Sequence, residues 1–180
     1  MPIEIEKKYR LTPEQVGRLR LRLAEAGAEG GGGAEFEENV IYTGPGLDPR
    51  LRVLRLRREG GRALFTFKER DLSGSAVKRQ REEETEVADS SALAAILEAL
   101  GYRPALVYEK RRETWRLDGA EVVIDELPFG LYAEIEGDEA RILEVEKLLG
   151  LDSAEAEPAS YPALTHRHGK RQGDAVEARF

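Results

Sequence analysis

Polar and charged side chains stand at every second position in several separate segments of the chain. Successive side chains of a β-strand point to opposite faces, so the members of each set share one face of their strand. In most of these segments the positions in between are apolar, which predicts strands with one charged and one apolar face. The sets are Glu4, Glu6 and Lys8; Arg55 and Arg57; Thr66 and Lys68; Glu82, Glu84 and Glu86; Lys110 and Arg112; and Glu134 and Glu136.

Charges of both signs on these faces favour an anionic ligand that carries a metal ion. Any single set is explained as well by a solvated sheet face with cross-strand salt bridges, but the pattern recurs in almost every predicted strand. Lys and Arg bind phosphate oxygens, and Arg does so through two parallel hydrogen bonds. Glu carboxylates suit hard divalent cations, which take their remaining ligands from phosphate and water. A triphosphate with Mg²⁺ or Mn²⁺ therefore satisfies both kinds of side chain.

The strands that carry these side chains are joined mostly by short turns, which favours antiparallel pairing. Three or four helices interrupt the strands, and Thr12, Pro13 and Gln15 form a capping box that begins the first helix. The other helices are expected near residues 90–100 and 139–149, with a short helical segment that ends near 160–162. The strands are expected near residues 3–11, 36–42, 51–58, 63–68, 77–87, 106–111, 114–117, 122–126 and 132–136.

The predicted helices need an apolar surface on which to bury Leu19, Leu97 and Leu148. Only the apolar faces of the strands offer one, so the helices are expected to cover those faces and to leave the charged faces together on the other side. About eight antiparallel strands can close into a barrel. The sequence thus predicts an α+β fold, an eight-stranded antiparallel closed β-barrel, or tunnel, with a charged lumen and helices packed outside.

Composition narrows the class of protein further. A chain of 180 residues with 41% hydrophobic residues can form one domain, which we place at residues 1–165, followed by a basic, disordered tail at 166–180. The net charge of −7 argues against nucleic acid as a partner. The chain has no Cys, which excludes disulfides, a Cys-ligated zinc and a thiol nucleophile. No apolar stretch approaches about 20 residues, so we expect no membrane association and a cytoplasmic location.

Short motifs in a fixed order resemble those of the CYTH family, the triphosphate tunnel metalloenzymes. This family includes class IV adenylate cyclases, thiamine triphosphatases and inorganic tripolyphosphatases. The resemblance extends over residues 3–161, roughly nine-tenths of the chain. Its motifs are Glu4-Ile5-Glu6-Lys7-Lys8, Leu54-Arg55-Leu56-Arg57, Thr66-Phe67-Lys68, Glu84-Thr85-Glu86, Lys110-Arg111-Arg112, Ile124 to Gly130 followed by Ala133-Glu134-Ile135-Glu136, and Ser160-Tyr161.

The resemblance implies the tunnel fold, a small-molecule triphosphate substrate and Mg²⁺ or Mn²⁺ as cofactor. Two carboxylates at alternate positions lie about 6.6 Å apart along a strand, close enough to share an ion or its water shell. Asp125 would orient a cation in the tunnel or pair with an Arg side chain. The expected metal ligands are Glu4, Glu6, Glu134 and Glu136. Glu84 and Glu86 would hold a second ion or position the attacking water. The phosphate clamp comprises Lys8, which also counts as catalytic, and Arg55, Arg57, Lys68, Lys110 and Arg112.

Three activities fit these residues. The favoured one is hydrolysis of the terminal phosphate, because it needs only a metal-bound water and the sequence shows no clear nucleobase site. The first alternative is a class IV adenylate cyclase that converts ATP to cyclic AMP and pyrophosphate, and the second is a polyphosphate- or nucleotide-binding module without turnover. One departure stands out: where many members carry an aromatic residue, Phe and Asp, this chain has Ile41-Tyr42-Thr43-Gly44. Whether two copies form a homodimer through the outer helices is left open.

Overall fold

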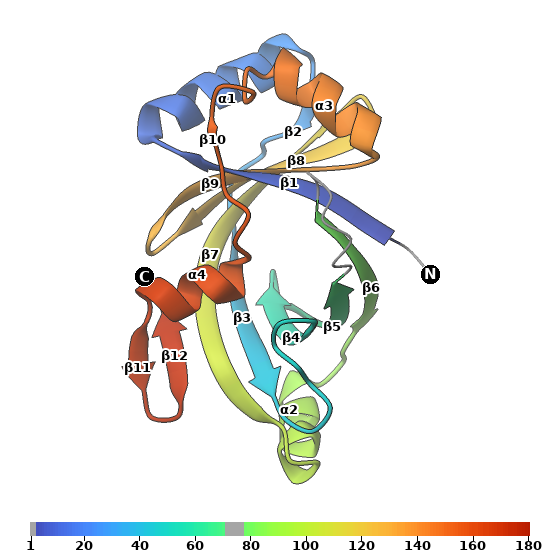
Figure 1. Ribbon diagram of the computed structural model, residues 1–180, viewed down its shortest axis with the longest axis vertical. Coiled ribbons are helices and arrows are strands. Elements are labelled where there is room, and N and C mark those ends of the chain that lie inside the picture. The colour runs from blue at the N-terminus through green and yellow to red at the C-terminus, as the bar shows by residue number, and fades with distance from the viewer. Residues whose placement is uncertain (1–2, 71–77) are drawn as a thin grey trace.

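The structure, a computed structural model, describes residues 3–70 and 78–180, with the side chains of Ile3, Glu4, Lys78 and Arg79 left outside the description. It is an α+β fold in which a strongly curled antiparallel sheet carries helices on its outer side (Figure 1). The helices are α1 (Pro13–Glu25), α2 (Ser90–Ala99), α3 (Glu139–Leu148) and α4 (Tyr161–His168). None of the helices in the described residues combines the length and apolar character that a membrane-spanning helix requires.

Within the described residues, eight longer strands build the curl, and short strands extend it. The longer strands are β1 (Ile3–Leu11), β3 (Glu35–Thr43), β4 (Arg52–Glu59), β5 (Arg62–Arg70), β6 (Lys78–Glu86), β7 (Arg103–Leu117), β8 (Ala120–Leu127) and β9 (Gly130–Glu136). The short ones are β2 (Glu29–Gly30), β10 (Glu155–Ala156), β11 (Lys170–Gln172) and β12 (Ala175–Ala178). All pairings among the longer strands are antiparallel, as the short turns predict.

Two strands, β1 and β7, each pair with one neighbour along part of their length and with another along the rest. The order is β11-β12-β7-β3-β4-β5-β6-β1-β9-β8, and β7 pairs additionally with β8. β7 contacts β3 through residues 103–112 and β8 through residues 111–117. β1 contacts β6 through residues 3–6 and β9 through residues 6–11. The structure therefore confirms the curled antiparallel sheet, whereas the closed eight-stranded barrel stays a prediction because β1 and β7 contact each of these neighbours over only part of their length.

The apolar faces of the strands pack against helices, as expected. α1 and α3 lie side by side over β1, β8 and β9 (Figure 1), where Leu23, Val122 and Ile142 are fully buried in one cluster. α2 buries Leu97 against β3, β4 and β7 in a second cluster. The expectation that Leu148 is buried is wrong, because its side chain is 55% exposed and the next residue, Leu149, fills the core with 1% exposed. At the end of α3, therefore, Leu149 packs against the sheet and Leu148 faces outward.

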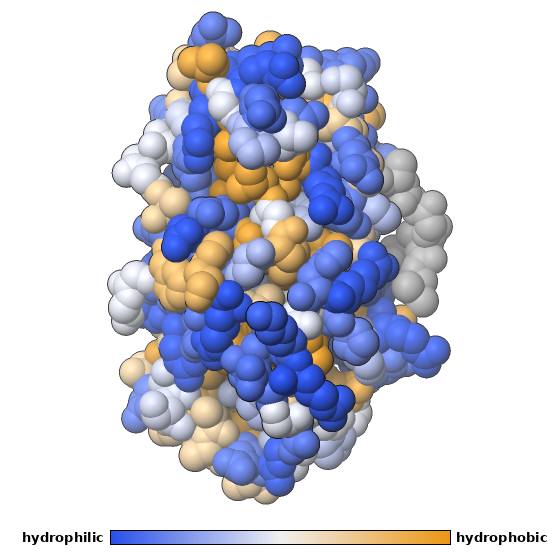
Figure 2. Space-filling view, turned by 90° about the vertical axis from the view of Figure 1, so that its left-hand side faces the viewer, coloured by the Kyte–Doolittle hydropathy of each residue, from blue (hydrophilic) through white to orange (hydrophobic). Residues whose placement is uncertain are grey.

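The C-terminal segment is folded, which corrects the expectation of a disordered tail at 166–180. Residues 161–168 form α4, and β11 and β12 form a hairpin whose strand β12 pairs in parallel with β7. Arg179 joins this hairpin to the sheet, since its Nη1 lies 2.8 Å from both Glu38 Oε2 and Glu109 Oε1. Figure 2 views the molecule from this side and shows a largely hydrophilic surface. The pairing partner of β12 lies far away in the sequence, so local composition could not reveal it.

We expect the amides of Ala175–Ala178 to exchange with solvent more slowly than those of the neighbouring turn at Gly173 and Asp174. The parallel pairing of Val176 with Leu106 protects the strand, whereas the turn has no such partner. Hydrogen–deuterium exchange by mass spectrometry or NMR measures this difference. Equally fast amide exchange over residues 166–180 would instead support the prediction of a disordered tail.

Candidate functional site

The inner face of the curled sheet surrounds a cavity of about 600 Å³. Most of its lining side chains are charged, and the lining comes from β1, β3–β9 and the residues around the start of α4. Glu86 is not among the lining residues, and the side chain of Glu4 lies outside the described residues. The predicted site residues that do line the cavity are Glu6, Lys8, Arg55, Arg57, Lys68, Glu84, Lys110, Arg112, Glu134 and Glu136.

One wall of the cavity is cationic and belongs to β4 and β5. Arg55 and Arg57 project from β4, and Lys68 and Arg70 project from β5. The Nη2 atom of Arg55 lies 3.2 Å from Thr66 Oγ1 and 3.5 Å from Glu84 Oε2. The Nε atoms of Arg55 and Arg70 are buried without a hydrogen-bond partner. Since a buried N–H group without a partner is costly, this wall is prepared to donate hydrogen bonds to an anion.

Carboxylates from three neighbouring strands line the opposite wall. Glu6 of β1 lies directly across from Glu136 of β9, which in turn lies across from Glu121 of β8. All three line the cavity. Like charges at directly opposed positions of a sheet repel each other, so a cation beside them is favourable. The sequence analysis missed Glu121, although its alternation with Val123 and Asp125 on one strand face could have indicated it.

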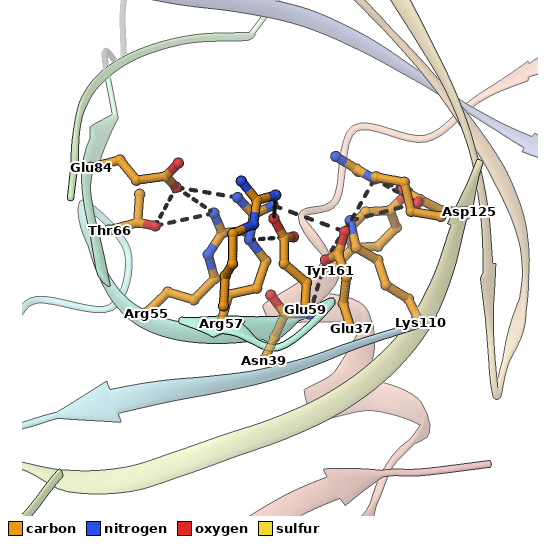
Figure 3. A network of polar contacts seen from close by, with 12 residues as sticks. Glu37, Asn39, Arg55, Arg57, Glu59, Thr66, Glu84, Lys110, Asp125 and Tyr161 are labelled. Carbon is orange, nitrogen blue, oxygen red and sulfur yellow. Dashed lines mark hydrogen bonds and ion pairs between the residues drawn. The ribbon is translucent and has the colours of Figure 1, made fainter. Parts of the chain in front are cut away.

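The floor between the two walls is a buried network of ion pairs (Figure 3). Arg112 donates to Asp125 through Nε at 2.8 Å and Nη2 at 2.6 Å, and its Nη2 also lies 2.8 Å from Glu134 Oε2. Lys110 Nζ lies 3.3 Å from Glu37 Oε2 and 3.5 Å from Asp125 Oδ1. Lys110, Glu37 and Asp125 are each no more than 2% exposed. The charges of Lys110 and Arg112 are therefore already compensated within the protein, before any ligand binds.

Burial and neighbouring charges shift the pKa values in this floor. Burial opposes ionisation of Asp125, but the charges of Arg112 and Lys110 outweigh it and lower the pKa of Asp125 well below its usual value. For Lys110, burial and the nearby Arg112 lower the pKa, and Asp125 and Glu37 only partly offset them. Burial also raises the pKa of Tyr161, whose hydroxyl donates to Asp125 Oδ2 at 2.7 Å. Asp125 is thus held ionised beside Arg112 and Lys110.

Lys8 connects the sheet to the segment that enters α4. Its ammonium donates to the carbonyl oxygen of Ala159 at 3.0 Å and lies 3.3 Å from Glu134 Oε1. The same nitrogen stands 4.0 Å from the centre of the Tyr161 ring, a cation–π contact. The sequence predicts a phosphate and catalytic role for Lys8, and in the structure Lys8 also fixes the chain at the edge of the cavity.

Divalent metal fits the carboxylate wall by the chemistry of its donors. Within residues 3–70 and 78–180, no three His, Asp or Glu side chains are close enough to form a ready-made metal cluster. Mg²⁺ does not need one, because it binds through one or two carboxylates and completes its shell with water and substrate phosphate. Glu6, Glu136 and Glu121 supply hard oxygen donors beside a cavity large enough for such a shell. The residues present are therefore compatible with Mg²⁺ or Mn²⁺.

The strongly curled antiparallel sheet therefore surrounds a cavity with facing acidic and basic walls. Comparison with known proteins gives the family: a model described as the CYTH domain matches residues 2–161. The chain therefore belongs to the CYTH family, which confirms the resemblance read from its motifs.

Individual relatives agree with this assignment. A putative adenylate cyclase from Methanocaldococcus jannaschii is 29% identical over 119 residues, which are 64% of this chain and 67% of that protein. A solved structure from Pyrococcus horikoshii is 25% identical, with a TM-score of 0.75 over 88% of this chain and 96% of its own. A putative adenylyl cyclase from Hippeastrum, described as having a dominant triphosphatase activity, shares the fold at 17% identity, with a TM-score of 0.68 and coverage of 93% and 96%.

Proposed function

We propose that this protein is a divalent-metal-dependent triphosphatase that hydrolyses the terminal phosphate of tripolyphosphate or of an organic triphosphate. The observation that carries the proposal is that one cavity has a cationic wall on β4–β5 and a carboxylate wall on β1, β8 and β9, with Glu82, Glu83 and Glu84 of β6 between them. A triphosphate with bound metal presents charge of both signs and can contact both walls at once. The curled sheet would act as the closed eight-stranded tunnel that the motifs imply.

Each wall has a distinct task in this proposal. Arg55, Arg57 and Lys68 hold the phosphate oxygens, the Arg side chains through two parallel hydrogen bonds and Lys68 as a point charge. Glu6 and Glu136 hold Mg²⁺ or Mn²⁺, assisted by Glu134 and by Glu4 of the same motif. When bound, the metal neutralises charge on the phosphate oxygens and lowers the pKa of water.

Glu84 is the best-placed residue to orient the attacking water. Its Oε2 accepts a hydrogen bond from Thr66 Oγ1 at 2.8 Å and lies 3.4 Å from Arg57 Nη2. A carboxylate fixed in this way can accept a proton from a water molecule that lies against the cationic wall. Glu86, which does not line the cavity, is left without a catalytic role.

The adenylate cyclase alternative is supported by the name of the Methanocaldococcus relative and by one feature of the cavity. Ile41 and Val53 line the cavity and pack in one apolar cluster with Tyr108 and Tyr161. A nucleobase could lie against this surface, with the ribose 3′-hydroxyl as nucleophile on the α-phosphate. Hydrolysis is favoured because it requires only water and because charged side chains dominate the lining.

Product analysis distinguishes these activities. The protein would be incubated with Mg²⁺ or Mn²⁺ and, separately, with tripolyphosphate, ATP and thiamine triphosphate, and orthophosphate, pyrophosphate and cyclic AMP would be quantified. Orthophosphate that appears only with added metal supports the triphosphatase. Cyclic AMP as the main product from ATP would favour the cyclase, and tight binding without any product would indicate a binding module.

Substitution of Arg55 by Gln is expected to raise KM for tripolyphosphate by about ten- to one-hundredfold, because a charge-assisted hydrogen bond to phosphate is lost. The effect on kcat should be smaller. Arg58→Gln provides a matched control, since Arg58 is the outward neighbour of Arg57 on the same strand and pairs with Glu38. Steady-state kinetics measure both values. An unchanged KM in a folded Arg55→Gln variant would remove Arg55 from the clamp.

A further inference from the structure

Arg70 lies at the end of the cationic wall that is nearest to α4. It is the last residue of β5, two positions after Lys68 and on the same strand face. Its Nη2 atom donates to Ser160 Oγ at 2.7 Å, and its Nε atom is buried without a hydrogen-bond partner. Both Arg70 and Ser160 line the cavity. The sequence analysis assigned a role to neither side chain.

Ser160 is held firmly beside Arg70. It is 8% exposed and is the N-cap residue of α4, where its Oγ accepts from Ala163 N at 3.4 Å. The preceding carbonyl, of Ala159, accepts from Lys8, and the hydroxyl of the following Tyr161 donates to Asp125. Because the N-terminus of a helix carries partial positive charge, α4 adds to the field of Arg70 at this point.

The cationic wall is longer than a triphosphate requires. Arg57 lies opposite Leu64 of β5, and Arg70 follows Leu64 by six residues on that strand. At about 3.3 Å per residue the backbone positions of Arg57 and Arg70 are roughly 20 Å apart. Three phosphorus atoms linked through two bridging oxygens span a much shorter distance. The proposed clamp of Arg55, Arg57 and Lys68 ends two residues, about 6.6 Å along β5, before Arg70, so Arg70 extends the cationic wall beyond the triphosphate clamp.

We propose that Arg70 and Ser160, together with the N-terminus of α4, form an additional phosphoryl-group subsite beyond the triphosphate clamp. The proposal deepens the proposed function and depends on it for the position of the triphosphate. The Ser160 hydroxyl can donate a hydrogen bond to a phosphate oxygen. Arg70, which now donates to the neutral Ser160 oxygen, can donate to a charged phosphate oxygen instead. The phosphoryl group comes either from a linear polyphosphate of four or more units or from orthophosphate.

Two variants and one control test the subsite. Arg70→Gln removes the cation. Ser160→Asp keeps a good N-cap for α4 but places a negative charge where the phosphoryl group would bind. Arg52→Gln is the control, because Arg52 lies on the adjacent strand, is exposed and pairs with Glu69. Each variant would be assayed with tripolyphosphate and tetrapolyphosphate, and orthophosphate binding would be measured by calorimetry independently of turnover.

If a longer polyphosphate occupies the subsite, both variants should lower kcat/KM for tetrapolyphosphate about tenfold more than for tripolyphosphate. If free orthophosphate occupies it, both variants should weaken orthophosphate binding by about tenfold. Arg52→Gln should leave all of these values unchanged. A selective loss with tetrapolyphosphate identifies the longer chain as the source, and a loss of orthophosphate binding alone identifies the free ion. Equal losses with both substrates and unaltered orthophosphate binding would overturn the subsite. If the wild type hydrolyses neither substrate, the proposed function fails, while the calorimetry still decides on the subsite.

Discussion

Replacing Glu136 by Gln is expected to lower the turnover of tripolyphosphate with Mg²⁺ roughly 100-fold or more, because metal ions contribute several kcal/mol to such reactions. Gln keeps the size of the side chain but removes the charge that binds the metal. Glu136 lies opposite both Glu6 and Glu121, so it is the central member of the carboxylate wall. Glu6→Gln should have the same effect.

A readout that does not depend on activity separates loss of metal from other causes. Titration with Mn²⁺, followed by electron paramagnetic resonance or calorimetry, should show weaker binding in Glu136→Gln and Glu6→Gln. Glu126→Gln is the control, since Glu126 is an exposed residue of β8 that pairs with Arg111. Thermal unfolding should be similar in all three variants. Wild-type turnover and wild-type Mn²⁺ binding in both cavity variants would refute the metal assignment.

Arg112→Met should lower the free energy of unfolding near pH 7 by about 3–5 kcal/mol, the range found when a buried ion pair loses one partner. Arg112 contacts Asp125, which is fully buried, and Glu134, which is 9% exposed. The variant would leave two buried carboxylates with too little positive charge beside them. Its neighbour Arg111 offers a control, because Arg111→Met breaks only surface contacts: an exposed ion pair with Glu126 and a cation–π contact with the Phe180 ring, each worth at most about 1 kcal/mol.

The pH dependence of this difference provides a second test. The folded protein lowers the pKa of Asp125, so Asp125 stabilises the wild type above its unfolded pKa of about 3.9, and this contribution fades as the pH falls further. Without Arg112, burial makes ionised Asp125 unfavourable, and protonation relieves that cost. The difference in the free energy of unfolding between wild type and Arg112→Met should therefore become smaller as the pH falls from about 7 to about 4. Urea unfolding at several pH values measures it, and a constant gap would mean that Arg112 acts through packing alone.

The sequence by itself determined the strand faces and the family. Alternation placed Arg55 beside Arg57 and Glu134 beside Glu136, and local chemistry such as the Thr12 capping box fixed where α1 begins. These features depend on neighbours within a few residues, where the periods of strands and helices make side-chain direction predictable. The order of the motifs then identified the CYTH family, which the match over residues 2–161 confirmed.

Only the tertiary structure decided which charges meet and which are already compensated. Strand register brings Glu121 beside Glu136, buries Glu37 under Lys110 and sets Arg70 against Ser160, 90 residues further along the chain. It also folds the C-terminal hairpin onto β7. Such contacts depend on pairings between distant segments, and neither composition nor periodicity within one segment records the partner. For this protein the residue types could be read locally, whereas the division of the cavity into two charged walls arises from the register of the curled sheet.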